Sequence, residues 1–186
     1  RNRSVYFNKF RIRQIKPMNY LSLTVFLVTV TLFAQEKPYV SDVWLSDQGN
    51  GTYKNPILYS DYSDPDVVQL GDDYFMTSSS FNAAPGLPIL HSKDLVNWEL
   101  VNYALPKQVP VEHFNTPQHG NGVWAPSIRV HNDEVYIYWG DPDFGIYMVK
   151  TTDPFGHWED PVLVMEAKGA IDPSPLWDDN GDAYLV

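Results

Sequence analysis

Hydrophobic residues in this chain occur in short runs that alternate with turn-forming residues. Beyond Gln35, no long segment repeats its apolar positions with the 3.6-residue period of a helix. Residues 135–139 show a period of two instead, with Val135, Ile137 and Trp139 on one face of the expected strand. Strands are expected at residues 66–70, 74–78, 135–139, 146–149 and 183–186. The pattern therefore predicts an all-β fold.

Two stretches of the chain resemble each other. Residues 90–98 and residues 149–158 each follow an expected strand and contain an Asp that precedes a Trp by a few residues. Tight turns at residues 71–74, 132–136 and 179–184 each lead into a strand with an aromatic residue. Repeated sheets of about 50 residues each are typical of propeller blades, and a β-sandwich is the alternative.

The end of the chain bears on the number of blades. Residues 184–186 read as the start of a strand with no turn after it. The roughly 150 residues beyond the N-terminal segment suffice for about three blades, whereas a closed propeller has about four to eight. We therefore expect residues 35–186 to be the N-terminal part of a propeller that is truncated at its C-terminus.

The N-terminal segment has the layout of an export signal. A mostly apolar run over residues 21–33 follows the basic stretch 1–16 and ends at Ala34. The run has the length of a signal-peptide core and is short for a membrane span, although a membrane anchor is the alternative. Residues 1–34 are expected to be a signal peptide with a basic N-terminal extension, and Met18 is a second candidate for the start. This predicts a periplasmic or secreted protein with no stable membrane insertion after cleavage.

The charge balance narrows the choice of partners. The chain has 13 Lys and Arg residues against 23 Asp and Glu residues, and no acidic residue lies within the first 34. The remainder is strongly acidic and would repel phosphate backbones, so no nucleic-acid partner is expected. The absence of cysteine excludes disulfides, a thiol nucleophile and cysteine-ligated zinc. The 12 Tyr and 6 Trp residues suit either sheet packing or stacking on sugars.

Two of the Asp-Pro pairs have surroundings that suit catalysis. Asp before Pro is an ordinary turn signal, and a turn role is the alternative for each of these carboxylates. Asp64 leads into the apolar stretch 66–70, and Asp172 stands among apolar residues in the stretch 169–177. A carboxylate at the inner end of a buried strand is held rigidly, as general acid–base catalysis requires. Asp64 and Asp172 are therefore the candidate catalytic residues.

Five motifs, in order along the chain, resemble glycoside hydrolase family 43. The first motif has two parts, Asn55-Pro-Ile-Leu-Tyr and Ser63-Asp-Pro-Asp. The other four are Gly86-Leu-Pro-Ile-Leu, Val123-Trp-Ala-Pro, Tyr138-Trp-Gly-Asp-Pro and Ile171-Asp-Pro-Ser-Pro. Together they cover about residues 49–186 and are most similar to the β-xylosidase and α-L-arabinofuranosidase branch. The resemblance implies a five-bladed β-propeller, often followed in that branch by a β-sandwich. This chain would cover roughly the first three blades.

The resemblance also implies roles for individual residues. It makes Asp64 the general base that activates the attacking water, and Asp172 the carboxylate that orients the substrate and raises the pKa of the general acid. That acid is a Glu in a Glu-Gly-Pro-like motif, which no Glu of this sequence matches, so it is expected beyond Val186. Phe81 and Trp124 are expected to line the sugar pocket, with core packing as the alternative for Trp124. No cofactor is required and no metal ligand is expected here; a structural calcium ion would take its ligands beyond Val186.

These expectations lead to an exported glycoside hydrolase that removes xylose or arabinofuranose residues from xylan or arabinoxylan. An inverting enzyme of this kind needs two carboxyl groups far enough apart to admit a water molecule. The partner is an oligosaccharide or polysaccharide substrate. Without the general acid, residues 35–186 alone are expected to be inactive. A propeller that binds carbohydrate without hydrolysing it is the alternative function.

Overall fold

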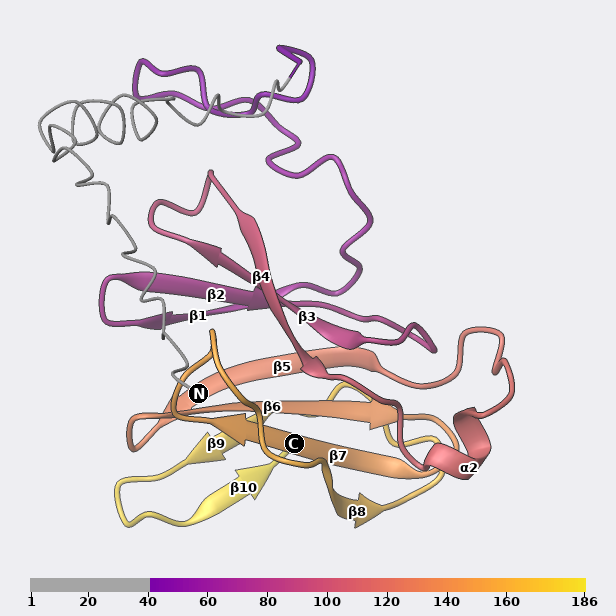
Figure 1. The fold of residues 1–186 in the computed structure, drawn as a ribbon. Coiled ribbons are helices and arrows are strands. Elements are labelled where there is room, and N and C mark those ends of the chain that lie inside the picture. Colours follow the sequence, from indigo (N-terminus) through magenta and orange to yellow (C-terminus); the bar gives the residue numbers. More distant parts are fainter. Residues whose placement is uncertain (1–40) are drawn as a thin grey trace, which may run out of the picture. The chain divides into compact units, whose positions relative to one another are not determined.

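The structure, a computed structural model, describes residues 41–186, and its regular secondary structure is β-strand apart from one helical turn. The first sheet contains β1 (Asp66–Leu70), β2 (Asp73–Thr77), β3 (Gly86–Ser92) and β4 (Glu99–Leu105). The second contains β5 (Trp124–His131), β6 (Glu134–Asp141), β7 (Gly145–Thr151) and β8 (Val162–Glu166), and the third pairs β9 (Pro175–Trp177) with β10 (Ala183–Leu185). A single helical turn, α2 (Val111–Phe114), lies between the first two sheets in the chain (Figure 1). The all-β prediction is confirmed.

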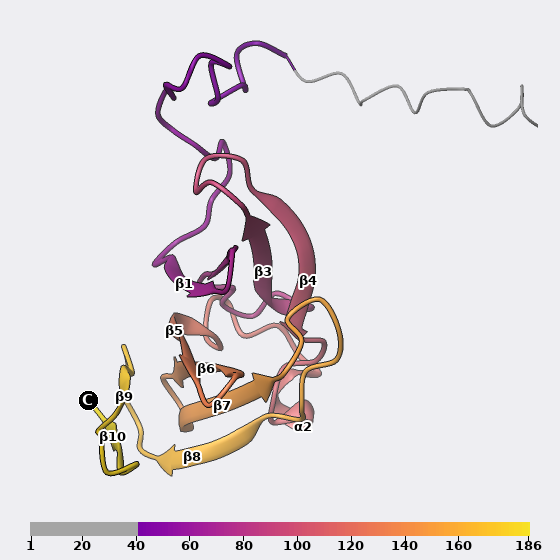
Figure 2. The same cartoon turned by 90° about the vertical axis from the view of Figure 1, so that its left-hand side faces the viewer.

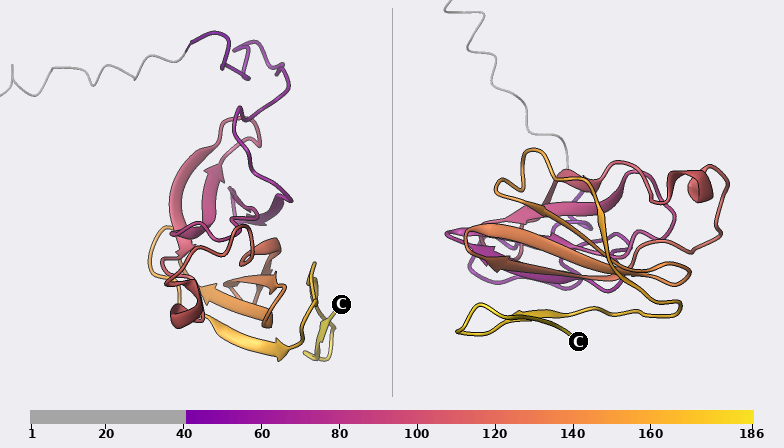
Figure 3. Two further views of the ribbon diagram at one scale, coloured as in Figure 1. Left: turned by 90° about the vertical axis from the view of Figure 1, so that its right-hand side faces the viewer. Right: turned by 90° about the horizontal axis from the view of Figure 1, so that it is seen from below.

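Each sheet is an antiparallel meander whose consecutive strands pair with one another. The first strand of the second sheet, β5, contacts both β1 and β9, which are the first strands of the other two sheets. Seen edge-on, the three sheets follow one another, with β1, β5 and β9 on one side and β4 on the other (Figure 2). The same succession is visible from the opposite side and from below (Figure 3). This is the arrangement of propeller blades, and it differs from the two facing sheets of a β-sandwich.

The turns between paired strands lie where the sequence predicts them. Residues 71–72 join β1 to β2, and residues 178–182 join β9 to β10. The turn from β5 to β6 consists of Asn132 and Asp133, with φ values of 50° and 62°. Positive φ at both central residues matches the right-handed twist of the flanking strands, and Asn and Asp tolerate it better than other side chains.

The hydrophobic core lies between the first two sheets. Val135, Ile137 and Trp139 of β6 are at most 1% exposed, as the alternating pattern predicts. Leu87 and Ile89 of β3 are fully buried and belong to the same cluster. Burial of each such side chain stabilises the fold by about 1.5–3 kcal/mol. This packing holds the second sheet against the first, which places β5 beside β1.

The two repeated stretches occupy equivalent places, between the third and fourth strands of the two four-stranded sheets. The Ser92 hydroxyl accepts the backbone N–H of Asp94 at 3.1 Å, and the Thr151 hydroxyl accepts that of Asp153 at 3.0 Å. The Trp near the end of each stretch donates its indole N–H to a backbone carbonyl of the turn before it. The internal repeat of the sequence is therefore a repeat of the blade.

The predictions for the N-terminal segment fall outside the described residues. The signal peptide at residues 1–34 and its apolar run at residues 21–33 therefore stay predictions. Within residues 41–186, no helix is long and apolar enough to cross a membrane.

Candidate active site

Near the start of each sheet, a residue in the left-handed backbone region precedes a proline. These residues are Asp64 before β1, Ala125 in β5 and Asp172 before β9, with φ values of 50°, 34° and 55°. Such a conformation is uncommon for a residue other than glycine and costs roughly 1–3 kcal/mol. Strain of this kind clusters at functional sites. Two of the three positions carry the predicted catalytic carboxylates.

Asp64 is an exposed residue whose carboxylate is held by a buried serine. Ser79, which is 7% exposed, donates its hydroxyl proton to Asp64 Oδ2 over 2.6 Å. The same hydroxyl oxygen accepts the backbone N–H of Ala125 at 2.8 Å. The backbone N–H of Ser79 donates to the Ser63 carbonyl at 2.9 Å. These bonds connect Asp64 to the second sheet as well as to its own.

Asp172 lies in the connection between β8 and β9 and is also exposed. Its segment packs closely against the end of β6. A Cβ atom on Gly140 would lie 2.9 Å from Ile171 Cα and 3.0 Å from the Ala170 carbonyl oxygen. Only a residue without a side chain allows this approach of two backbones. The position of Asp172 is therefore set by the packing of its backbone.

Within the described residues, the strands that follow these carboxylates are not buried, contrary to the expectation from the sequence. β1 alternates between half-buried and exposed residues, and β9 has one buried residue among three. Both strands lie at an edge of their sheets, where neighbouring strands cover one side only. At Asp64 the holding contact comes from Ser79 of the same sheet, whose hydroxyl is bonded in turn by Ala125 of the second sheet. At Asp172 it comes from Gly140 of the second sheet.

Arg129 of β5 joins the segments that carry the two aspartates. Its guanidinium forms an ion pair with Asp66 and donates to the Ser174 hydroxyl at 3.3 Å. Asp66 and Ser174 each stand two residues after a candidate catalytic residue, Asp64 and Asp172 respectively. A planar guanidinium can donate hydrogen bonds to two partners at once in a fixed geometry. One side chain thus links the first sheet to the third.

The two predicted aromatic residues belong to segments that pair with each other. Phe81 forms an isolated antiparallel bridge with Val123, the residue before Trp124. Phe81 is 39% exposed, and Trp124 is half-buried with its indole N–H bonded to a backbone carbonyl at 2.7 Å. The tryptophans of the hydrophobic core are Trp139 and Trp158. The structure therefore places the backbone segments of the two predicted aromatic residues next to each other.

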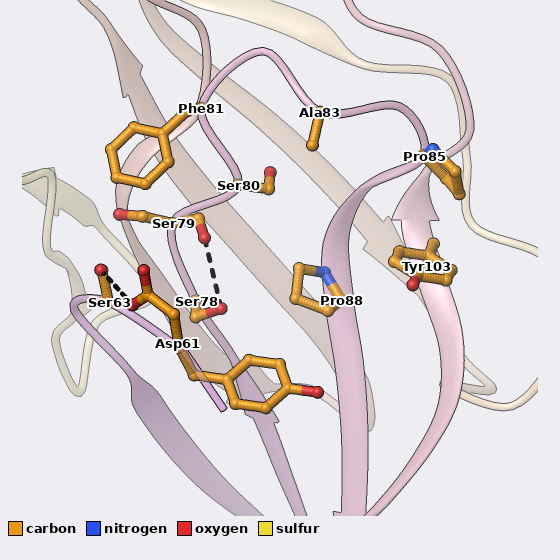
Figure 4. A pocket seen from close by; sticks show the side chains of 11 residues that line it. Asp61, Ser63, Ser78, Ser79, Ser80, Phe81, Ala83, Pro85, Pro88 and Tyr103 are labelled. Carbon is orange, nitrogen blue, oxygen red and sulfur yellow. Dashed lines mark hydrogen bonds between the residues drawn. The ribbon is translucent and has the colours of Figure 1, made fainter. Parts of the chain in front are cut away.

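A cavity of about 280 Å³ opens beside Ser79 and Phe81. Phe81 stands on one side of it, and Pro85 and Tyr103 stand on the other (Figure 4). Asp64 is not among its lining residues. The cavity thus borders the Asp64 site without containing the carboxylate.

A further carboxylate, Asp141, is buried at the end of β6 and is 2% exposed. It accepts the backbone N–H groups of Asp143 and Phe144 at 2.9 and 3.2 Å. Burial raises the pKa of Asp141 above its ordinary value of 3.8. The Asn121 amide donates to Asp143 at 2.8 Å. Asp141 therefore shapes a turn that is tied to the segment leading into β5.

Ser79 and Arg129 are absent from the sequence prediction of the site. Ser79 is the middle residue of three successive serines after an apolar strand, and buried hydroxyls of this kind need hydrogen-bond partners. Arg129 is a charge within a largely apolar strand. Their partners Ala125 and Asp66 lie 46 and 63 residues away, which no local pattern specifies. Within the part of the chain that the structure describes, no three His, Asp or Glu side chains come together as a metal site.

Fold and site together define a class of protein, a β-propeller with a carboxylate in the left-handed region before the first strand of two of its blades. The sequence model described as glycosyl hydrolases family 43 matches residues 53–186. The chain belongs to this family.

Relatives and solved structures agree with this assignment. The chain is 37% identical over 145 residues to a putative beta-xylosidase of Xylanibacter ruminicola, covering 75% of this chain and 26% of the relative. It is 37% identical over 129 residues to a non-reducing end alpha-L-arabinofuranosidase of Bacteroides ovatus, covering 66% of this chain and 24% of the relative. The chain thus spans about a quarter of the length of the curated relatives it matches.

Among solved structures, a GH43_12 protein retrieved from capybara gut metagenome is 40% identical with a TM-score of 0.60, over 70% of this chain and 25% of that one. The GH43 protein BlXynB from Bacillus licheniformis is 29% identical with a TM-score of 0.62, over 72% and 28%. The predicted five-bladed propeller fold is confirmed. The described residues supply two four-stranded blades and two strands of a third.

Proposed function

We propose that this chain is part of an exported glycoside hydrolase that cleaves xylose or arabinofuranose residues from xylan or arabinoxylan with inversion of configuration. Membership of family 43 supports hydrolysis of glycosidic bonds. Matched relatives are named as a β-xylosidase and as an α-L-arabinofuranosidase, which supports these two sugars together rather than one of them. The observation that carries the proposal is the matched placement of Asp64 and Asp172 in the left-handed region before a proline.

Asp64 acts as the general base in this proposal. A general base takes a proton from the attacking water, so its oxygen must be both accessible and fixed in direction. Asp64 is exposed, and the hydrogen bond from Ser79 fixes one of its two carboxylate oxygens. The other oxygen is then directed at the water.

Asp172 supports the general acid. Inverting hydrolysis uses a protonated carboxylic acid to release the leaving group, and a nearby carboxylate keeps that acid protonated by repulsion between like charges. Asp172 supplies the neighbouring charge. The acid itself is a Glu in the part of the protein that the printed sequence does not cover, so residues 41–186 alone would not complete the reaction.

Phe81 and Trp124 form a wall of the sugar site. A flat aromatic ring offers a large apolar face with a specific geometry, and the C–H face of a sugar ring matches it. Support for this wall is the bridge between Phe81 and Val123, which pairs the backbone segments that carry the two rings. The neutral sugar substrate is also compatible with the acidic charge of the protein. No cofactor takes part in these steps.

Export places the enzyme in the periplasm or outside the cell, where polysaccharide substrates are available. The support for this is the basic stretch followed by the apolar run at residues 21–33. Cleavage near Ala34 would leave the propeller without its apolar segment.

The test is an assay of the full-length protein on a matched pair of aryl β-xyloside and aryl α-L-arabinofuranoside. Hydrolysis of either substrate, abolished by Asp64→Asn, is the expected result, and the ratio of the two rates identifies the preferred sugar. A protein that binds xylo-oligosaccharides but hydrolyses neither aryl glycoside would instead be a carbohydrate-binding propeller. That outcome would contradict the proposal.

A further inference from the structure

We infer that Ser79 is a positioning residue for the general base, acting through its hydrogen bond to Asp64. The inference rests on the proposed function, in which Asp64 activates water. Ser79 lies just beyond the end of β2 and is 7% exposed, so its hydroxyl is largely shielded from water. Its two partners belong to different sheets.

The geometry fixes the direction in which the Ser79 hydroxyl donates. A serine hydroxyl has one proton and two acceptor lone pairs. The backbone N–H of Ala125 can only donate, so it occupies a lone pair of the hydroxyl at 2.8 Å. The hydroxyl proton is then directed at Asp64 Oδ2, 2.6 Å away. Hydrogen bonds to charged groups are about twice as strong as neutral ones, so this contact holds the carboxylate firmly.

The neighbouring serines do not share this role. The Ser78 hydroxyl contacts only the Ser79 carbonyl oxygen, at 3.4 Å, and the Ser80 hydroxyl accepts the backbone N–H of Leu87 at 3.0 Å. All three serines follow one another at the end of the same strand. Ser79 alone among them reaches Asp64, which makes Ser78 a matched control.

The same contact couples the base to the aromatic wall. Ala125 directly follows Trp124, and its φ of 34° sits at the point where the pairing of β5 with β6 shifts register. That conformation belongs to the bulge from which the Ala125 N–H reaches Ser79. The hydroxyl of Ser79 therefore sets the position of Asp64 relative to the ring that is proposed to bind the sugar.

The experiment is a double-mutant cycle in the full-length enzyme, with Ser79→Ala, Asp64→Asn and the double variant, assayed on an activated aryl glycoside. Ser79→Ala is expected to lower kcat by about 10- to 100-fold with little change in KM, because a misplaced base costs rate rather than ground-state binding. In the Asp64→Asn background, the same substitution should change kcat by less than about twofold, because Ser79 acts through the lost carboxylate.

Three further variants separate positioning from a general effect on folding. Ser78→Ala removes the hydroxyl of a serine that is also buried and should leave kcat unchanged. Ser79→Thr keeps the donor and should retain most of the wild-type kcat. Ser79→Cys keeps the volume with a weaker donor, and its kcat should fall between those of Ser79→Thr and Ser79→Ala.

Two results would overturn the inference. One is an unchanged kcat for Ser79→Ala; the other is an equal effect of Ser79→Ala with and without Asp64, since a purely structural role is additive. Near-wild-type turnover of Asp64→Asn has a different meaning, because it contradicts the proposed function itself. The cycle therefore distinguishes a failure of the base assignment from a failure of the role of Ser79.

Discussion

The segments around Asp64 and Asp172 share a positive φ at the aspartate but are held in different ways. Both residues precede a proline, and their φ values are 50° and 55°. Asp64 is fixed through its side chain by Ser79, whereas Asp172 is placed through its backbone, which packs on Gly140. A base must point a particular oxygen at water, but a carboxylate that acts by charge needs only to be near its target. The difference in contacts thus matches the two proposed roles.

The second blade has the same turn without the carboxylate. Ala125 precedes Pro126 with a φ of 34°, in the place that corresponds to Asp64 and Asp172. Its backbone N–H bonds to Ser79 and so supports the proposed base of the first blade. The repeated turn therefore serves as a scaffold, and the residue placed on it decides its chemistry.

The largest expected effect comes from removing the base. Asp64→Asn should lower kcat of the full-length enzyme by about 10³-fold, because an amide of the same shape cannot accept the proton of water. KM should change little, since the sugar-binding groups remain. Steady-state kinetics on a xylo-oligosaccharide measures both values. Asp72→Asn, in the exposed turn between β1 and β2, is the control and should behave as wild type.

Removing the second carboxylate should change the pH dependence. In the proposed mechanism, Asp172 raises the pKa of the general acid by repulsion between like charges. Asp172→Asn should therefore move the basic limb of the pH–rate profile to lower pH, because the acid loses its proton more easily. The profile of kcat/KM between pH 4 and 9 tests this. An unmoved limb would leave Asp172 with a turn role only.

The link between the two segments should be sensitive to Arg129. Arg129→Ala removes contacts to Asp66 and Ser174 and should lower the free energy of unfolding by about 1–3 kcal/mol, with a fall in kcat beyond that of a remote variant. Lys150→Ala breaks an ion pair with Glu134 on the same sheet, at 2.8 Å.

The control variant Lys150→Ala should lower the free energy of unfolding by less than about 1 kcal/mol and leave kcat unchanged. Denaturant unfolding and kinetics on the same samples separate stability from catalysis. Equal effects of the two substitutions on kcat would contradict a linking role for Arg129.

The smallest effect concerns the buried Asp141. Its raised pKa means that the charged form is less favourable in the folded state than in the unfolded state. The contribution of Asp141 to the free energy of unfolding is therefore largest at low pH. It is lost as the pH rises from the ordinary pKa of 3.8 through the raised pKa of the folded state.

Asp141→Asn keeps an acceptor for the N–H groups of Asp143 and Phe144 while removing the buried charge. The stability of Asp141→Asn relative to wild type should increase as the pH rises from 3.8 through the raised pKa of Asp141, and then level off. Chemical denaturation at several pH values measures it. Asp133→Asn, in the exposed turn after β5, should show no such trend.

The sequence predicts the strands better than it predicts the site. The alternation of Val135, Ile137 and Trp139 is confirmed because a period of two specifies which side chains face the core. The same pattern carries no information about which strand of the next sheet lies alongside. The contact of Ser79 with Ala125 and the contacts of Arg129 depend on that placement, since they join segments of different sheets.

Some strands also escape the alternating pattern. β8 consists of residues that are all exposed although most are apolar, and β9 has only three residues. Within the described residues β8 has no buried face, so its apolar residues show no alternation with polar ones. Asp64 and Asp172 are predicted as candidates from the resemblance of ordered motifs to family 43. Each of the two motifs that contain them lies just before the first strand of a blade.

The most direct test of Asp64 as the base of an inverting glycosidase is rescue of Asp64→Gly by azide. Glycine suits the left-handed conformation at this position, so the substitution removes the carboxylate without backbone strain. The full-length variant should hydrolyse an activated aryl glycoside about 10³-fold more slowly than wild type. Added azide, a nucleophile that needs no base, should restore turnover and yield a glycosyl azide of inverted anomeric configuration, identified by NMR. The wild-type enzyme should itself release the sugar with inverted configuration, because a retaining enzyme that lacks its nucleophile would give the same inverted azide. Near-wild-type hydrolysis by the variant without azide, or retention of configuration by the wild-type enzyme, would contradict the assignment.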